Sequence, residues 1–350
     1  MRFVIDVREA CRARRTGKGQ WVLGFVSELL KRENELLLLT DRALPSAWKS
    51  SRAICWYSSG GALWHLRAWW MLKKLTGDCI YIAPTSFIVP ALLPRRVQSV
   101  PVVHDLIAFR SEPHSARARI LERIFLPLAL RKARHICALS ENTARDLRAR
   151  FPAIKQHVTP IFAGPMRKQP PRPSWEGSAV LCIGTLSPRK NQLNLLRAYR
   201  TLPDDLRSRH PLVLAGARGW QDAQILRELD TICGAQWAGH VDDDTYEALL
   251  QECAILALPS LYEGFGLQVL DALQRGIPVL LSDRGSLREV AGEAAVYVDP
   301  MDVFAISAGI TQLLSDAELR KRLHMLGPEQ AKRFSWQRTV DLFLEALHHR

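Results

Sequence analysis

The chain has 350 residues, of which 47% are hydrophobic and 24% are charged. This composition excludes an intrinsically disordered chain, and the length favours two domains over one core. The formal net charge of +13 points to a phosphate-bearing partner, which leaves nucleic acid, an anionic membrane or a phosphorylated substrate open. The 7 cysteines include no C-x-x-C pair, so neither a zinc site nor a disulfide framework is predicted.

The N-terminal segment MRFVIDVRE has the pattern of a strand, and it lacks the apolar region and cleavage site of a signal peptide. No apolar run reaches the roughly 18 residues that a membrane-spanning helix needs. We therefore expect a cytoplasmic protein.

Short apolar runs alternate with helical patterns along the first half of the chain. The strands predicted there are 2–7, 35–40, 53–57, 79–83, 100–104, 135–140 and 157–162. The helices predicted there are 21–31, 62–75, 116–133 and 141–151. The proline-rich stretch GPMRKQPPRPSWEGS, residues 164–178, then predicts a linker.

The alternation resumes after this stretch. The strands predicted in the second half are 179–184, 211–215, 235–238, 254–258, 278–281 and 295–298. Helices are predicted over 191–201, 222–233 and 245–253, in the segment after 264, and twice near the C-terminus. This order predicts the α/β class, with a parallel sheet covered by helices on both faces in each half. In such sheets ligands bind beyond the carboxyl ends of the strands.

The segment SLYEGFGLQVLDAL, residues 260–273, places Glu263 at the start of a predicted helix, with Asp271 one to two turns further on. The unpaired backbone donors at that helix start would belong to Gly264, Phe265, Gly266 and Leu267. Such donors suit a diphosphate, which would then have a carboxylate on either side. The alternative is a helix capped by Glu263, with Asp271 in solvent.

The segment CIGTLSPRKNQLNLL is a predicted strand-to-helix turn with two cations, Arg189 and Lys190, after a strand that ends at Gly184 and Thr185. Two cations beside a helix start suit a pyrophosphate. Asn191 is the predicted N-cap of that helix. The alternative is an ordinary exposed loop.

Two motifs in the first half follow predicted strands. In SVPVVHDLIAF, His104 could donate a hydrogen bond to a sugar or phosphate and Asp105 could hold the loop, or His104 could be satisfied by nearby backbone. In RRTGKGQWVLGF, Gly17 and Gly19 precede a predicted helix, where a flexible loop could cradle an acceptor or a phosphate. A short G-x-G is a weak motif, so an ordinary loop stays open.

The D-x-D pair in GHVDDDTYEALL, Asp242 and Asp244, has two interpretations. It could bind a metal ion, but an aspartate before a helical pattern is more simply an N-cap. We therefore predict no metal site.

Together these motifs resemble the retaining glycosyltransferases of family 4, whose GT-B architecture has two facing Rossmann-like domains with a cleft between them. The family hallmark of a glutamate, seven residues and a second glutamate reads here Glu263-GFGLQVL-Asp271. The similarity extends over most of the chain, through GHVDDDTYEALLQECAILALPSLYEGFG, GIPVLLSDRGSLREVAGEAAVYVDP, VVHDL, LSENTARDL and GTLSPRKN.

The resemblance implies a role for each motif. Glu263 and His104 would be catalytic residues beside the transferred sugar, and Asp271 would contact the ribose. Gly184, Thr185, Arg189, Lys190 and the residues 263–267 would bind the donor, and Gly17, Gly19 and Asp105 would form an acceptor or phosphate loop.

Two positions depart from the family pattern. The second acid is Asp271, one methylene shorter than glutamate, and Thr185 stands where many members have arginine, so Arg189 would supply that charge. The resemblance further implies retention of configuration, with the departing phosphate oxygen as base and with no metal or other cofactor.

The resemblance also divides the chain. Residues 1–165 would be an N-terminal acceptor-binding domain, 166–178 a linker and 179–335 a C-terminal domain that binds a nucleotide sugar. The last segment, 336–350, would be a helix that could cross back to the N-terminal domain.

The motif GTLSPRKN resembles family members that use GDP-mannose or a rhamnose-type donor. We therefore expect a hexosyltransferase that acts on a saccharide or lipid-linked saccharide in the synthesis of cell-surface polysaccharide such as lipopolysaccharide. One alternative is a GT-B sugar-nucleotide epimerase, which would need no acceptor. The other is a basic nucleic-acid-binding protein, although no nucleic-acid motif is visible.

Two segments predict contact with an anionic membrane. The segment GALWHLRAWWMLKKL combines three tryptophans with Arg67, Lys73 and Lys74, so its helix is either buried or partly immersed in lipid. The segment SARARILERIFLPLALRKARH places apolar side chains on one helix face, namely Ile120, Leu121, Ile124, Phe125 and Leu128. We expect the N-terminal domain to dock peripherally on the inner face of the cell membrane, unless both helices pack on the sheet.

Overall fold

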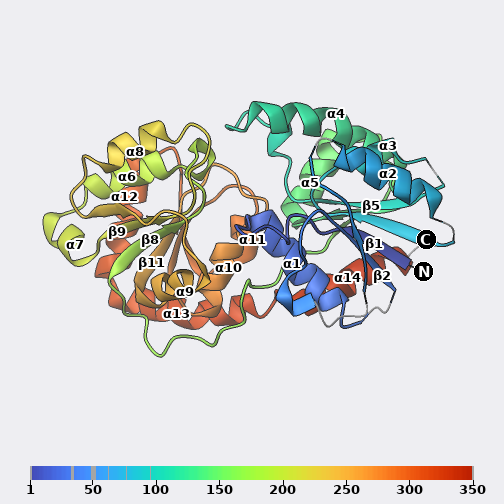
Figure 1. Cartoon of the computed structure of the whole chain (residues 1–350). Coiled ribbons are helices and arrows are strands. Elements are labelled where there is room, and N and C mark those ends of the chain that lie inside the picture. Colours follow the sequence, from blue (N-terminus) through green and yellow to red (C-terminus); the bar gives the residue numbers. More distant parts are fainter. Residues whose placement is uncertain are drawn as a thin grey trace. The chain divides into compact units, whose positions relative to one another are not determined.

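The computed structural model describes residues 2–32, 35–48, 53–61, 63–75, 77–94 and 96–348. The chain divides into two units (Figure 1). The first unit comprises Met1–Arg110, His114–Met166 and Phe334–Arg350, and the second comprises Ser111–Pro113 and Arg167–Arg333. Each unit is built on one sheet.

The sheet of the first unit has seven strands in the order β3-β2-β1-β4-β5-β6-β7, and all neighbouring strands are parallel. The strands are β1 (Arg2–Asp6), β2 (Leu36–Thr40), β3 (Ile54–Tyr57), β4 (Cys79–Ala83), β5 (Gln98–Val103), β6 (Ile136–Ala138) and β7 (Val158–Pro160). Most are short apolar runs, as expected of parallel strands with both faces covered. The strand order reverses between β1 and β4, which is the switch point where ligands bind in such sheets.

Helices cover both faces of this sheet (Figure 1). One face carries α2 (Trp64–Lys74), α3 (Ile88–Leu92), α4 (Ala116–Lys132) and α5 (Glu141–Arg150). The other face carries α1 (Gly17–Leu29) and the last helix, α14 (Trp336–His348). The short 3₁₀ turns are η1 (Ser46–Trp48) and η2 (Ile107–Phe109).

The C-terminal helix α14 is joined to the first unit by aromatic contacts. The Phe343 ring lies 5.1 Å from that of Phe25 in α1 and 5.8 Å from that of Phe3 in β1. At the start of α14, Trp336 Nε1 donates to the Pro165 carbonyl at 2.8 Å. Beside this indole, Gly24 of α1 leaves room for the ring. Although it is last in sequence, α14 therefore completes the helix layer that α1 begins.

The sheet of the second unit has six strands in the order β10-β9-β8-β11-β12-β13, again all parallel. The strands are β8 (Ala179–Ile183), β9 (Leu212–Ala215), β10 (Ala235–Trp237), β11 (Cys253–Leu258), β12 (Val279–Ser282) and β13 (Ala295–Val298). The strand order reverses between β8 and β11, which is the position where sheets of this kind bind ligands.

Helices also cover both faces of the second sheet (Figure 1). One layer contains α6 (Gln192–Arg200), α7 (Asp204–Arg209), α8 (Ala223–Leu229) and α12 (Val303–Ser315). The remaining helices are α9 (Asp243–Glu252), α10 (Leu267–Gln274), α11 (Leu287–Ala291) and α13 (Ala317–Ala331), and a 3₁₀ turn, η3 (Pro188–Lys190), precedes α6. The predicted α/β class with two parallel sheets is confirmed.

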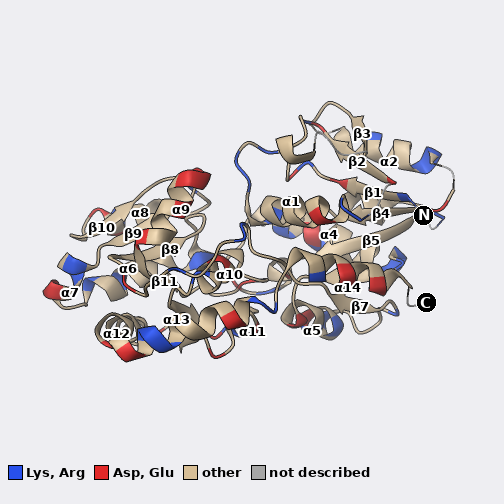
Figure 2. Ribbon diagram, turned by 90° about the horizontal axis from the view of Figure 1, so that it is seen from below, with Lys and Arg blue, Asp and Glu red and all other residues tan. Residues whose placement is uncertain are grey.

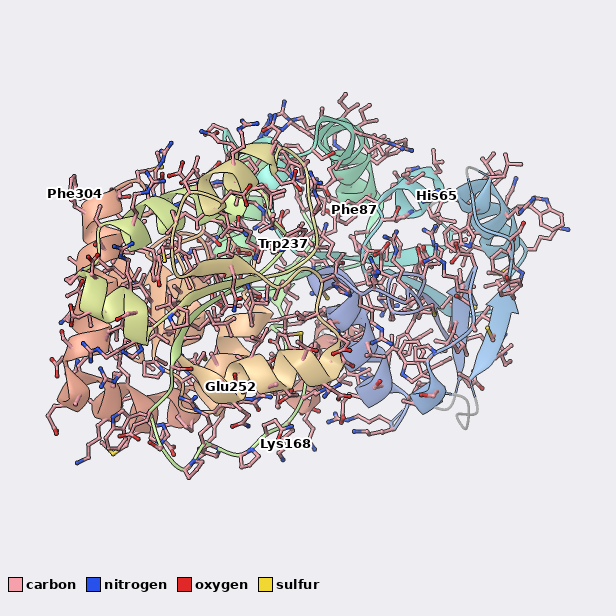
Figure 3. The ribbon with its side chains drawn as sticks, turned by 60° about the vertical axis from the view of Figure 1, so that its left-hand side comes forward. His65, Phe87, Lys168, Trp237, Glu252 and Phe304 are labelled. Carbon is pink, nitrogen blue, oxygen red and sulfur yellow. The ribbon has the colours of Figure 1, made fainter. Side chains whose placement is uncertain are left out.

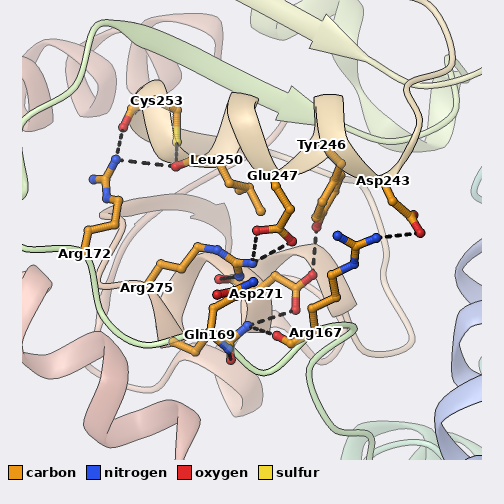
Figure 4. A network of polar contacts seen from close by, with 11 residues as sticks. Arg167, Gln169, Arg172, Asp243, Tyr246, Glu247, Leu250, Cys253, Asp271 and Arg275 are labelled. Carbon is orange, nitrogen blue, oxygen red and sulfur yellow. Dashed lines mark hydrogen bonds and ion pairs between the residues drawn. The ribbon is translucent and has the colours of Figure 1, made fainter.

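The segment 164–178, predicted as a linker, has no helix or strand. Its buried Arg172 donates to the Cys253 carbonyl at 2.8 Å, at the end of α9 (Figure 4), and also to the Gln251 carbonyl at 3.0 Å. The Gln169 backbone N–H donates to the Gln274 side chain at 3.2 Å. This segment is therefore attached to α9 and α10, where Arg172 pairs carbonyls that a helix end leaves without partners.

Several predicted elements need correction. The helix predicted to start at residue 21 begins at Gly17, so Gly17 and Gly19 lie in its first turn and not in a flexible loop. The reason is the N-cap Thr16, whose side chain accepts from the Gly19 N–H at 3.5 Å. The short helices α3, α7 and α11 were not predicted, and three helices follow β13 where two were expected.

The helices α2 and α4 each combine a buried and an exposed face. Helix α2 buries Trp64, Ala68 and Leu72 and exposes Leu66 and Trp70. The exposed large side chains of α4 are Ile120, Leu121, Ile124 and Leu128. Within the described ranges, no helix is long and apolar enough to cross a bilayer.

The contact between α1 and α14 predicts a stability effect. A Cβ at Gly24 would lie 2.1 Å from Trp336 Cε2, so Gly24→Ala forces the indole to move. Overpacking of this kind costs about 1–3 kcal/mol. We expect a correspondingly lower free energy of unfolding in urea. The matched control is Gly17→Ala in the same helix, where a Cβ meets no atom within 4 Å; equal stability of the two variants would contradict the packing assigned to α14.

Candidate functional site

Three charged side chains meet beyond the carboxyl ends of β8 and β11, at the switch point of the second sheet. Lys190 Nζ lies 2.6 Å from Glu263 Oε1, and Arg189 Nη1 lies 3.0 Å from Glu263 Oε2. Glu263 and Lys190 are only 6% and 8% exposed, whereas the Arg189 side chain is 24% exposed. One carboxylate is therefore paired with two cations, so these three side chains carry a net charge of one positive unit.

Backbone contacts fix the position of Glu263. The Ser286 N–H and Oγ both donate to the Glu263 carbonyl, at 3.1 and 3.0 Å. Gly285 has a φ of +65°, and a Cβ there would lie 2.5 Å from the same carbonyl oxygen. On the other side, the Leu261 N–H donates to the Arg189 carbonyl at 2.9 Å. The loops after β8, β11 and β12 are thus joined around this carboxylate.

The electrostatics keep Glu263 ionised. Burial alone would raise its pKa, but Lys190 and Arg189 outweigh burial and lower the pKa to about 2. Burial lowers the pKa of Lys190, and the Glu263 carboxylate opposes that effect. Glu263 is therefore a hydrogen-bond acceptor near neutral pH, not an acid that could donate a proton. The alternative of Glu263 as an exposed helix cap is wrong, because the side chain is buried between cations.

The turn after β8 is shaped around Lys190. Gly184 has a φ of +153°, and a Cβ there would lie 3.1 Å from Lys190 Cε. The exposed Thr185 offers its carbonyl to Gln192 Nε2 at 3.1 Å. Asn191 stands at the N-cap position of α6, as predicted, with a φ of +60°, but its side chain does not cap the helix. Its amide instead donates to the carbonyls of Pro259 and Pro300, at 2.9 and 2.7 Å, so the turn is tied to the loop after β11.

The helix after Glu263 begins later than predicted. Helix α10 starts at Leu267, with Gly266 at the N-cap and a φ of +96°, a conformation that favours glycine. Gly264 and Phe265 lie in the buried turn before it. Of the four residues expected to form the helix start, only Leu267 is therefore helical, and the remaining three form the turn that leads into it.

Asp271 lies inside α10 and is fully buried (Figure 4). Its carboxylate accepts hydrogen bonds from the Tyr246 hydroxyl at 2.9 Å and from Gln274 Nε2 at 3.4 Å. Because the side chain is fully buried, contact with a ribose hydroxyl would require the atoms that cover it to move. The alternative of Asp271 in solvent is wrong.

Sequence reasoning missed the polar network around Asp271. The fully buried Arg275 donates to both carboxylate oxygens of Glu247, at 2.9 and 2.7 Å, and to the Asp271 carbonyl at 2.7 Å (Figure 4). The sequence offers one indication of this network, which is an arginine within the mostly apolar segment LDALQRGIPVLL. A cation in a buried segment requires hydrogen-bonding partners.

The first unit holds the remaining predicted residues at the carboxyl edge of its own sheet. His104 directly follows β5, and its Nε2 donates to the Pro84 carbonyl at 2.7 Å. Burial and the nearby Lys18 lower the pKa of His104 to about 4. The ring is therefore neutral at physiological pH, with Nδ1 as its acceptor nitrogen.

The residues around His104 have different roles. Asp105 Oδ1 accepts from the Ile107 N–H at 3.1 Å and so holds the loop. Lys18 Nζ lies 3.7 Å from Oε1 of Glu122 in α4. A Cβ at Gly19 would lie 2.5 Å from the Glu9 carbonyl oxygen, so this glycine is required by packing, whereas a Cβ at Gly17 would meet open space. Of the two glycines, only Gly17 faces open space.

The D-x-D pair is explained by helix capping. Asp242 is the N-cap of α9, and its Oδ1 accepts from the Thr245 N–H at 2.8 Å. The N-cap interpretation is confirmed. Over the part of the chain that the structure describes, no group of three or more metal-ligating side chains is found.

Comparison with known proteins gives similarities along the chain. Residues 168–330 match the family model described as glycosyl transferases group 1. The O-antigen chain mannosyltransferase B of Escherichia coli is 36% identical over 297 residues, which cover 79% of this chain and 76% of that protein. The MMP alpha-(1->4)-mannosyltransferase of Mycolicibacterium hassiacum is 28% identical over 236 residues, which cover 64% of this chain and 57% of that protein.

Solved structures resemble the chain over its full length. Anabaena HepE, solved in complex with UDP and glucose, has a TM-score of 0.77 at 16% identity and covers 100% of both chains. WaaG, a glycosyltransferase involved in lipopolysaccharide biosynthesis, has a TM-score of 0.74 at 12% identity and covers 99% of this chain and 100% of its own.

The depressed pKa of Glu263 predicts a pH-dependent stability. The paired carboxylate stabilises the fold fully above its ordinary pKa, and this contribution is lost as the pH falls toward about 2. Removing one partner of a buried ion pair costs about 3–5 kcal/mol. Glu263→Gln should therefore lower the free energy of unfolding at pH 7, by a margin that narrows as the pH falls below about 5.

Denaturant unfolding at a series of pH values measures this difference. Glu252→Gln, at the exposed end of α9, is the control and should match the original chain at every pH. A deficit of Glu263→Gln that stays constant down to about pH 3 would contradict the assigned ion pair.

Proposed function

Because the chain belongs to the group 1 glycosyl transferases, also called family 4, we propose that it transfers mannose from GDP-mannose to a saccharide acceptor. The family consists of retaining, metal-independent hexosyltransferases, and the predicted GT-B fold and enzyme class are confirmed. The proposal rests chiefly on one observation, the buried cluster of Glu263, Arg189 and Lys190 at a switch point.

The choice of mannose rests on relatives. Both the Escherichia coli and the Mycolicibacterium hassiacum relatives are mannosyltransferases by name. The name of the first also supports an acceptor in O-antigen chains, and thus a role in lipopolysaccharide synthesis, with a lipid-linked saccharide as acceptor. A rhamnose-type donor remains the second candidate.

The cluster would act on the leaving group. A diphosphate carries more negative charge than one carboxylate, so it would replace Glu263 as the partner of Arg189 and Lys190. These cations, with backbone N–H groups of 264–267, would stabilise the charge that develops on the departing phosphate. Glu263, once released, would accept hydrogen bonds from hydroxyls of the transferred sugar. Gly184 and Thr185 would border the donor, and Asp271 would reach the ribose after exchanging its Tyr246 hydrogen bond.

The acceptor would attack from the face that the diphosphate leaves, with the departing phosphate oxygen as base and with retention. No second carboxylate is assigned as a nucleophile, as double displacement would require. Neutral His104 would hydrogen-bond the transferred sugar, with Asp105, Gly17 and Gly19 shaping the acceptor side. We propose residues 1–165 as the acceptor domain, 166–178 as the linker and 179–335 as the donor domain. The segment 336–350 would pack with the first of these.

We further propose that the first unit docks on an anionic membrane through α2 and α4. Two of the most exposed apolar side chains, Ile120 at 58% and Trp70 at 57%, lie on these helices. Lys74 lies over the Trp70 ring, 3.2 Å from its centroid, and Figure 2 marks cations on α2. Apolar side chains flanked by cations favour the interface of an anionic bilayer. The protein would then be cytoplasmic and peripheral on the inner face of the cell membrane.

A transfer assay tests the proposed reaction. With GDP-mannose and mannose-containing saccharides, the product should gain one hexose, equally with excess EDTA or added magnesium. Glu263→Gln should lose about 100-fold or more in turnover. Glu263→Asp keeps the negative charge but shortens the side chain, so it tests whether the length of the side chain matters in a folded protein. Glu252→Gln is the control. A changed nucleotide sugar formed without acceptor would instead show an epimerase. Near-normal turnover of folded Glu263→Gln would refute the catalytic role.

Co-sedimentation with liposomes tests the membrane proposal. Binding should require anionic lipid, weaken with salt and fall when Arg67, Lys73 and Lys74 are all changed to Ser. A matched loss of charge in the second unit, at Arg197, Lys321 and Arg322, should leave binding unchanged. Equal binding to neutral vesicles, or none to anionic vesicles at low salt, would remove this role from α2 and α4.

A further inference from the structure

A second group of polar side chains lies at the switch point of the first sheet, where β1 and β4 end. Arg8 follows β1 by two residues, Ser86 follows β4 by three, and His65 lies in the first turn of α2 (Figure 3). The reversal of strand order between β1 and β4 is the feature that forms a ligand crevice in open parallel sheets. The reversal in the second sheet holds the Glu263 cluster, whereas this one has no role in the proposed transfer so far.

The three side chains contact one another. Arg8 Nη2 lies 3.5 Å from His65 Nε2, and Ser86 Oγ lies 3.3 Å from the same nitrogen. His65 and Ser86 are both partly exposed, and the Arg8 side chain is 20% exposed. A guanidinium, an imidazole and a hydroxyl group are therefore all partly accessible to solvent at the carboxyl ends of β1 and β4.

Two buried polar atoms beneath this group are not satisfied. The Arg8 guanidinium lies 3.3 Å from the centroid of the Trp64 ring, and the His65 ring stands edge-on to the same indole at 5.4 Å. The Trp64 Nε1 and the Tyr81 hydroxyl are both buried and have no hydrogen-bond partner within the described residues. Buried polar groups are nearly always paired, so these two atoms mark a region whose hydrogen bonding is incomplete.

The charge of the group indicates the kind of ligand. Arg8 makes two side-chain hydrogen bonds to Asp6, at 3.0 and 2.9 Å. The negative charge of the Asp6 carboxylate offsets the positive charge of the guanidinium. Burial and Arg8 lower the pKa of His65, so its ring is neutral at physiological pH. A neutral group of hydrogen-bonding side chains suits the hydroxyls of a saccharide better than a phosphate, which would need uncompensated cations.

The group also adjoins His104 through the loop after β4. His104 donates to the Pro84 carbonyl. Ser86 is two residues further along the chain than Pro84, so the Cα atoms of Pro84 and Ser86 are at most about 7 Å apart. This is the scale of a single monosaccharide. During transfer the receiving sugar of the acceptor would lie against the transferred sugar at His104, so the next sugar of the acceptor would reach Ser86 and His65.

We infer that Arg8, His65 and Ser86 form a second subsite for the acceptor saccharide, which binds a sugar adjacent to the one that receives the transferred residue. The inference rests on the proposed glycosyl transfer. Asp6 orients the guanidinium, while His65 and Ser86 supply hydrogen bonds to sugar hydroxyls. The subsite makes the enzyme prefer an acceptor of more than one sugar.

The test compares acceptors of different length. The acceptors are methyl α-mannoside and a methyl α-mannotrioside, with GDP-mannose as donor. The variants are His65→Gln with Ser86→Ala, and separately Arg8→Lys, which keeps a cationic partner for Asp6. The control is His157→Gln, an exposed histidine before β7 at the opposite edge of the same sheet.

We expect the KM for the trioside to rise about tenfold in the subsite variants, because losing one hydrogen bond weakens binding by about that factor. The KM for the monosaccharide, the KM for GDP-mannose and kcat at saturation should not change, and the control should match the original chain. A purely structural role would instead alter both acceptors alike. Equal changes for the two acceptors, or no change for either, would overturn the subsite.

Direct binding separates this inference from the proposed function. Titration of the trioside can be followed by tryptophan fluorescence, because Trp64 packs against both Arg8 and His65. If the original chain transfers nothing from GDP-mannose, the proposed function fails, but weaker trioside binding by the subsite variants still supports the subsite. Unchanged binding in those variants would reject it.

Discussion

The structure of the second unit depends on one buried carboxylate between two cations. Glu263 binds Lys190 and Arg189 directly, and its backbone carbonyl is held by Ser286. Burying these charges is costly unless each is paired, so the loops that carry them must keep their positions. These three side chains together carry one net positive charge, and in the proposed function a more highly charged anion binds there. The loop contacts and the proposed diphosphate site would therefore depend on the same three side chains.

Parallel topology explains why functional residues from distant parts of the sequence meet. Each sheet reverses its strand order once, between β1 and β4 in the first unit and between β8 and β11 in the second. The loops that diverge at a reversal leave a crevice that side chains can line. In the second unit Glu263 lies at this reversal, and in the first unit Arg8, His65 and Ser86 lie at it. Two sheets with the same kind of reversal thus carry a charged and a neutral group of polar side chains.

The sequence predicted the strands well because parallel strands are continuous apolar runs between turn residues. It predicted the loops less well, since their geometry depends on side chains far away in the chain. Asn191 has the sequence of an N-cap, yet its amide binds Pro259 and Pro300. Glu263 resembles a helix cap in sequence because nothing local reveals that Arg189 and Lys190 surround it. The sequence around Asp271 likewise permits an exposed side chain, and only the fold brings the Tyr246 hydroxyl into contact with it.

In the proposed function, a nucleoside diphosphate replaces Glu263 at Arg189 and Lys190. Calorimetric titration of GDP into folded variants tests it most directly. Competition for the same cations predicts that Glu263→Gln binds GDP at least as tightly as the original chain, whereas Arg189→Gln and Lys190→Gln each lose about tenfold or more in affinity. Loss of GDP binding in Glu263→Gln, with unchanged binding in the two cation variants, would contradict the account.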